Sequence, residues 1–152
     1  MKSPHTYKAA FFALVGIFLM CGFLKCSAHV PESVKAIGIY TSSIALGAIG
    51  DGLNFRGYSQ GGDQSLGHIC DALSTGILLM SPLFLDMEKW WWSVISYVSL
   101  RIALFDPLFN ISAGLPLNYR GVANVWDKSV GLKMWHRSAF LIIGVAIPIN
   151  RL

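Results

Sequence analysis

The sequence has few charged residues. Of its 152 residues, 13% are charged and 54% are hydrophobic, whereas a soluble domain carries roughly 25% charged and about 45 to 50% apolar residues. This deficit argues against a water-soluble fold and predicts a small domain embedded in the lipid bilayer. The net charge of +4 arises from basic residues scattered singly, so the chain lacks the basic patch that nucleic-acid binding requires.

Cysteines and long apolar runs are also scarce. Cys21, Cys26 and Cys70 are odd in number and form no Cys-x-x-Cys pair, which argues against a disulfide framework and a zinc knuckle. We expect buried, unreactive thiols. No apolar segment reaches the roughly 18 uninterrupted residues that make a membrane span obvious, so buried helices of a soluble assembly are kept as an alternative.

Five apolar segments nevertheless have lengths suited to helices that cross a membrane. We predict an all-α fold, a small polytopic transmembrane bundle of four to five helices, as a single integral membrane domain over residues 1–152. The expected helices cover residues 9–26, 34–50, 68–85, 89–106 and 134–149. Gly50 and Gly52 loosen the backbone after the second segment, and Pro107 disfavours helix in the residue before it. The first segment is interpreted as a retained helix, with a signal sequence cleaved near Ala28 as the alternative.

The distribution of lysine and arginine predicts an orientation. If the five segments cross in alternation, seven basic residues share one side: Lys2, Lys8, Arg56, Arg120, Lys128, Lys133 and Arg137. Four lie on the other side: Lys25, Lys35, Lys89 and Arg151. Because basic loops stay in the cytoplasm, we expect a bacterial plasma membrane protein with a cytoplasmic N-terminus.

The same alternation gathers polar residues at one face, predicted to be cytoplasmic. These residues are Asp51, Asn54, Arg56, His68, Asp71, Asp106, Asn110, Asp127, His136 and Arg137. His68 and Asp71 are three residues apart and so share a helix face. A histidine beside a carboxylate could ligate a metal or relay a proton. The simpler interpretation is that both residues lie at the start of a helix, where the helix dipole stabilises the Asp71 carboxylate and His68 is hydrated at the membrane interface.

Arg101 is predicted to lie deeper, within the fourth segment. An arginine at such depth costs ~2.5 to 3.5 kcal/mol on insertion scales unless it finds a partner or reaches the interface. Asp51 and Asp71 on neighbouring helices are the expected partners. The alternative is that Arg101 binds an anionic head group or phosphate, for which the planar guanidinium is well suited.

Part of one motif resembles that of the CDP-alcohol phosphotransferases, which are membrane enzymes whose paired helices hold metal ions with four aspartates. The order D-G-x-x-A-R followed by G-x-x-x-D is matched in part by Asp51, Gly52, Arg56, Gly67 and Asp71. The family's first and last aspartates fall on Ala48 and Thr75, and its alanine falls on Phe55. Two of the four metal-binding carboxylates are therefore missing, and we do not assign the chain to this family.

Two functions follow from these patterns. The first is an accessory or structural membrane subunit that needs no cofactor and contacts the bilayer and a protein partner or further copies of itself. The second is a membrane enzyme, or a binder of a phosphorylated lipid head group, that uses a divalent metal. In the second, Asp51, His68 and Asp71 are the candidate catalytic residues and metal ligands. The candidate substrate-binding residues are Arg56, Arg101, Asp106 and Asn110. A pore has less support, since no segment shows a continuous polar stripe.

Overall fold

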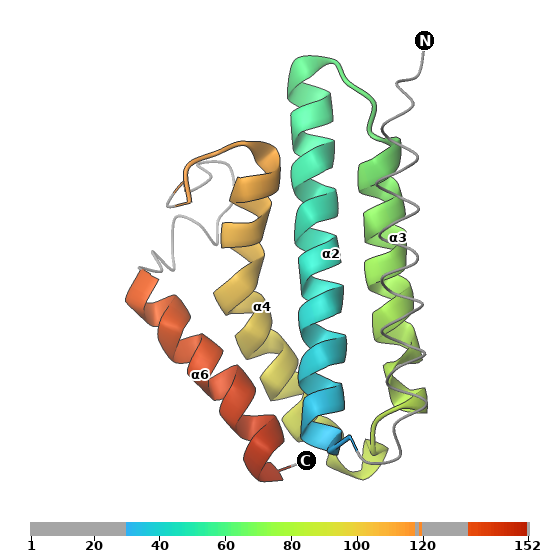
Figure 1. Ribbon diagram of the computed structural model, residues 1–152, viewed down its shortest axis with the longest axis vertical. Coiled ribbons are helices and arrows are strands. Elements are labelled where there is room, and N and C mark those ends of the chain that lie inside the picture. The colour runs from blue at the N-terminus through green and yellow to red at the C-terminus, as the bar shows by residue number, and fades with distance from the viewer. Residues whose placement is uncertain (1–29, 118, 120–133, 152) are drawn as a thin grey trace.

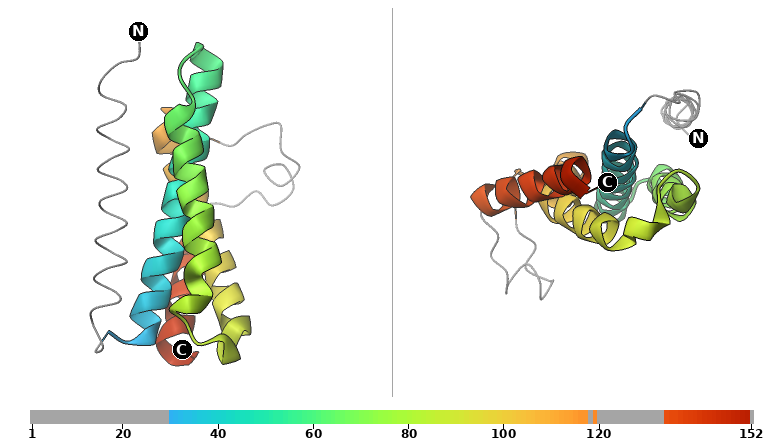
Figure 2. Two further views of the ribbon diagram at one scale, coloured as in Figure 1. Left: turned by 90° about the vertical axis from the view of Figure 1, so that its right-hand side faces the viewer. Right: turned by 90° about the horizontal axis from the view of Figure 1, so that it is seen from below.

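The chain forms a bundle of helices that run alternately up and down. The computed structural model describes residues 30–117, Tyr119 and residues 134–151. These residues form α2 (Glu32–Gln60), α3 (Ser65–Met80), α4 (Trp90–Ala113) and α6 (Met134–Arg151), with the short 3₁₀ turns η1 (Ser81–Leu83) and η2 (Met87–Lys89) and no strand. α2 lies between α3 and α4, and α6 packs against α4 (Figures 1 and 2). The predicted all-α bundle is confirmed.

Three of the described helical segments are long and apolar enough to cross a membrane: α2, α3 continued through η1, and α4. In α2, 50% of the residues in the apolar window are buried, against 11% in the window of α3. α2 is thus the central helix, while α3 turns most of its apolar side chains outward, as lipid-facing helices do. The predicted helix over residues 9–26 lies outside the described residues.

The core of the bundle lies where α2 meets α4. Ile39, Tyr40 and Ile44 of α2 pack with Leu100 of α4, and all four are buried. The Tyr40 and Tyr97 rings meet edge to face at 5.8 Å between centroids. On the outer side of α4, the Ser96 hydroxyl donates to the Gly144 carbonyl at 2.7 Å, which satisfies a buried hydroxyl that would otherwise be costly.

The predicted end of the second helix at Gly50 is wrong. α2 continues through Gly50 and Gly52 to Gln60, and Gly61 closes it in the left-handed conformation with φ of 69°. Both inner glycines are buried against neighbouring helices, so they permit close packing rather than ending the helix. Most of the polar stretch expected to form a loop is therefore the last third of α2.

The predicted end of the fourth helix at Asp106 is also wrong. α4 passes through Pro107 and ends at Ala113, before Gly114 with φ of 74°. Proline removes one backbone hydrogen bond, which membrane helices tolerate when neighbours supply donors to the freed groups. Pro107 frees the carbonyl of Ala103, four residues earlier. Near this point α6 packs against α4, and the Arg137 Nη1 atom donates to the Ile102 carbonyl at 3.1 Å.

The third predicted helix, residues 68–85, begins and ends earlier than expected. α3 starts at Ser65, where the Asp63 Oδ1 atom accepts a hydrogen bond from the Ser65 amide at 2.9 Å. It ends at Met80, because Pro82 lies in the following 3₁₀ turn. The last helix, predicted over residues 134–149, is α6 and runs from Met134 to Arg151.

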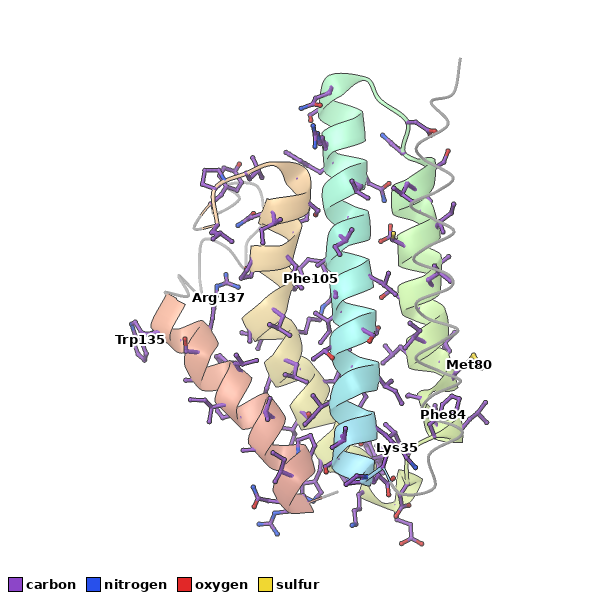
Figure 3. All side chains as sticks on the ribbon, in the orientation of Figure 1. Lys35, Met80, Phe84, Phe105, Trp135 and Arg137 are labelled. Carbon is purple, nitrogen blue, oxygen red and sulfur yellow. The ribbon has the colours of Figure 1, made fainter. Side chains whose placement is uncertain are left out.

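One end of the bundle holds the end of α2, the start of α3 and the end of α4 (Figure 1). Lys35, Met80 and Phe84 lie toward the opposite end (Figure 3). There, the Glu32 carboxylate accepts a hydrogen bond from the Asp86 amide and ties the start of α2 to the connection before α4. α6 starts beside the middle of α4 rather than at the polar end, which corrects the predicted position of His136 and Arg137.

Candidate functional site

A line of small and polar residues joins α2 to α3. On α2 it comprises Ser43, Gly47, Gly50, Asn54 and Gly57, and on α3 it comprises Gly67, Asp71 and Ser74. We call this set the α2–α3 seam. The α2 positions are spaced alternately four and three residues apart, the repeat that keeps one helix face toward an antiparallel partner. Small residues at such a face let two helix backbones approach closely in a membrane.

The two backbones touch where Gly50 meets Gly67. A methyl group on Gly50 would lie 2.8 Å from the Gly67 carbonyl oxygen and would overlap the Asp71 carboxylate. A methyl group on Gly67 would lie 2.8 Å from the Gly50 carbonyl oxygen and would overlap the Asn54 side chain. Only glycine fits both positions without a shift of the helices.

Two serines form reciprocal hydrogen bonds deeper in the seam. The Ser43 hydroxyl donates to the Ser74 carbonyl at 3.0 Å, and the Ser74 hydroxyl donates to the Ser43 carbonyl at 2.7 Å. Ser43 is fully buried. Because each hydroxyl bonds to the opposite backbone, the pair fixes the register of α2 against α3 at a depth where water is scarce.

The main polar contact of the seam joins Asn54 and Asp71. The Asn54 Nδ2 atom donates to the Asp71 Oδ2 atom at 2.8 Å. The other carboxylate oxygen faces Gly50, and the Asn54 Oδ1 atom is buried against Gly67 with no hydrogen-bond partner among the described residues. The carboxylate of Asp71 therefore lies in the contact between α2 and α3.

Three of the predicted site residues come together at this end of the bundle. Asp71 is half-buried and interacts electrostatically with Asp51 and His68, both of which are exposed. Arg56 is exposed five residues beyond Asp51, on another face of α2, and its Nε atom donates to the Gln60 side chain at 3.4 Å. Thr75 bonds only back to its own helix, at the Asp71 carbonyl.

Arg101 does not join this group. It is exposed on α4, and its guanidinium carbon lies 4.2 Å from the centroid of the Phe105 ring. The predicted pairing with Asp51 or Asp71 is wrong, because these carboxylates lie at the end of the bundle, level with the last turns of α4: Gly52 packs against Phe109 and Ala113.

Asp106 and Asn110, the other predicted substrate-binding residues, have partners within the chain. Asp106 forms an ion pair with Arg137, which lies near the start of α6 on the side facing α4 (Figure 3). Asn110 is buried, and its Nδ2 atom donates to the carbonyls of Leu117 and Tyr119 at 3.1 and 3.0 Å. It holds the turn that follows α4. Asp127 lies outside the described residues.

The side chains at this site give little support to a metal centre. Across residues 30–117 and 134–151, no three His, Cys, Asp or Glu side chains lie close enough together to hold a metal ion. Asp51, His68 and Asp71 thus remain predicted metal ligands without a matching geometry. Cys70 is a free, buried thiol, as expected.

The α2–α3 seam was not predicted, although the sequence carries a signal for it. Gly50 was expected to end a helix, and no role was predicted for Ser43 or Ser74 or for a contact of Asn54 with Asp71. The alternation of four and three residues among the small positions of α2 is readable in the sequence. The partner residues on α3 cannot be identified from the sequence, because that requires knowing the register in which the two helices pack.

Comparison with known proteins gives neither a family nor a function for this chain. No family model, no curated protein and no solved structure matches it.

Proposed function

We propose that this chain is a structural or accessory subunit of a membrane assembly, whose polar end joins its own helices. The observation that supports this most directly is the position of the Asp71 carboxylate. One of its oxygens accepts from Asn54, and the other packs over Gly50. A catalytic or metal-binding carboxylate needs a free face toward its ligand, whereas this one is engaged in the contact between α2 and α3.

The proposed location is the plasma membrane of a bacterium, with the polar end and the N-terminus in the cytoplasm. The support is the excess of lysine and arginine in the segments assigned to that side, which remains when Arg137, paired with Asp106 inside the bundle, is left out of the count. A cysteine introduced as Ser59→Cys, in a background where the native cysteines are serine, is expected to resist a membrane-impermeant maleimide in intact cells. Glu88→Cys, exposed at the opposite end, is the matched control and is expected to react. Efficient labelling of Ser59→Cys before permeabilisation would reverse the orientation.

The second candidate function is binding or turnover of a phosphorylated lipid head group with a divalent metal. It is favoured by the exposure of Asp51 and His68 near Asp71, and of Arg56 at the same end of the bundle. Carboxylates can hold a metal ion, and an arginine can hold a phosphate; Arg56 lies on another face of α2 from Asn54, so it would have to reach around the helix end to join Asp71. This function requires Asp71 to leave Asn54 or to share its oxygens with the ion.

The variant Asp71→Ala separates the two candidates. If the carboxylate is structural, its loss leaves the Asn54 amide unsatisfied and lowers the free energy of unfolding in detergent by about 2 kcal/mol. Asp71→Asn keeps an acceptor and is expected to lose less, and His68→Ala is the exposed control. Purified wild type and Asp71→Ala are expected to carry the same small amount of divalent metal. Stoichiometric metal in the wild type that disappears in Asp71→Ala would favour the head-group enzyme instead.

A further inference from the structure

The start of α4 marks one membrane interface. Trp90, Trp91 and Trp92 are all exposed, and tryptophan gathers at the level of lipid head groups. The guanidinium of Arg151 lies over the Trp92 ring at 5.1 Å from its centroid, which places a further cation at the same level. We therefore take these indoles as a depth marker for α4.

Arg101 lies near the middle of the bilayer on this scale. A rise of ~1.5 Å per residue places it about 14 Å from Trp92 along the axis of α4. The hydrocarbon core is about 30 Å thick, so the midplane is close to Arg101. Lipid phosphates stay at the head-group level, and the guanidinium rests on Phe105, which lies inside the same apolar span.

The guanidinium has no carboxylate partner among the described residues. The ion pair at neighbouring depth joins Arg137 to Asp106, and the guanidinium of Arg101 lies over the face of the Phe105 ring. An aromatic ring attracts a cation but does not neutralise its charge. A charged side chain that faces outward from the middle of a membrane helix normally pairs with a group of opposite charge.

A second copy of this chain does not supply that group. The chain has eight acidic residues. Glu32, Asp86 and Glu88 lie at the end where α4 begins, whereas Asp51, Asp63 and Asp71 lie at the opposite end. Asp106 is already paired with Arg137. A copy aligned in either direction therefore presents none of these at the depth of Arg101. Asp127, the eighth, lies outside the described residues and is tested below.

We propose that Arg101 anchors a carboxylate that a transmembrane helix of a different protein carries at mid-membrane depth. This inference rests on the proposed role as a subunit and specifies the chemistry of the partner. The outer face of α4 beside Arg101 is formed by Val94, Ile95 and Val98, which are exposed and apolar. A partner helix that packs there would match these residues with apolar side chains and would place one Asp or Glu against the guanidinium.

The experiment uses synthetic transmembrane peptides of leucine and alanine in phosphatidylcholine vesicles. One peptide carries a single central Glu, and its matched control carries Gln. Energy transfer between the labelled full-length chain and the peptide measures association. The Glu peptide is expected to bind the wild type at least 10-fold more tightly than Arg101→Gln, whereas the Gln peptide binds both equally. Arg56→Gln, at the exposed end of α2, is expected to bind like the wild type.

A charge reversal guards against loss of fold. Arg101→Glu is expected to prefer a peptide with a central Lys. Equal binding of the Glu and Gln peptides to the wild type would overturn the proposal. Binding of the Glu peptide that appears only in the Asp127→Asn variant would also overturn it, because Asp127 of the same chain would then be the partner of Arg101. Self-association of the chain that depends on Arg101 would overturn it as well. If the Glu peptide binds as expected but the chain is purified from native membranes without any partner protein, the proposed subunit role is wrong. The proposed affinity of Arg101 for a carboxylate is then still supported.

Discussion

Replacing Gly67 with alanine is expected to lower the free energy of unfolding by about 2 kcal/mol, the usual range for an overpacked contact. The added methyl group meets the Gly50 carbonyl oxygen at 2.8 Å and overlaps the Asn54 side chain. Neither neighbour can yield easily, because one is helix backbone and the other is bonded to Asp71. Reversible unfolding in mixed micelles, followed by circular dichroism, measures the change.

The same helix provides a matched control. Gly76 of α3 has no atom within 4 Å of the place a methyl group would take. Gly76→Ala is therefore expected to leave stability unchanged or to raise it by up to ~1 kcal/mol, the difference in helix propensity between the two residues. If Gly67→Ala and Gly76→Ala unfold alike, the close approach of α2 and α3 is not present in the protein.

The second large effect is expected at the ion pair between α4 and α6. Arg137→Gln removes the partner of Asp106 and the donor to the Ile102 carbonyl. The Arg137 side chain is 13% exposed and that of Asp106 is 42% exposed, so neighbouring protein atoms cover most of the arginine and part of the carboxylate. Losing a hydrogen bond to a charged group within the span is expected to cost about 2 kcal/mol.

A double-mutant cycle identifies the pair as the cause. Asp106→Asn with Arg137→Gln is expected to be more stable than the sum of the two single losses predicts, because no charge is left alone. Arg56→Gln, which removes an exposed arginine, is expected to change stability by less than about 0.5 kcal/mol. Strict additivity of the two changes would show that Arg137 and Asp106 do not interact.

Among the described residues, hydropathy predicted which segments become helices, but it did not predict where they end. The predicted boundaries at Gly50 and Asp106 follow from local preferences of glycine and proline, which hold for an isolated chain. In the bundle, neighbouring helices pack against both points: α3 and α4 fill the space beside Gly50 and Gly52, and Arg137 of α6 pairs with Asp106, which precedes Pro107. Tertiary contacts therefore override the local rules.

The candidate site was predicted in part for a similar reason. Alternation of helices brings Asp51, His68 and Asp71 to one end, and this follows from order alone. The partner of Asp71 and the isolation of Arg101 depend on how each helix is rotated about its axis. A hydropathy pattern with apolar residues on nearly all sides of a helix does not determine that rotation.

The length of α2 has a consequence at the lipid surface. Its 29 residues extend about 43 Å, well beyond a hydrocarbon core of about 30 Å, and α2 also extends past the end of α4 (Figure 1). The C-terminal turns of α2 therefore extend through the head-group layer. They carry Tyr58, which is 83% exposed. A soluble macromolecule that approaches the bilayer from that side therefore contacts the end of α2 before it contacts phospholipid.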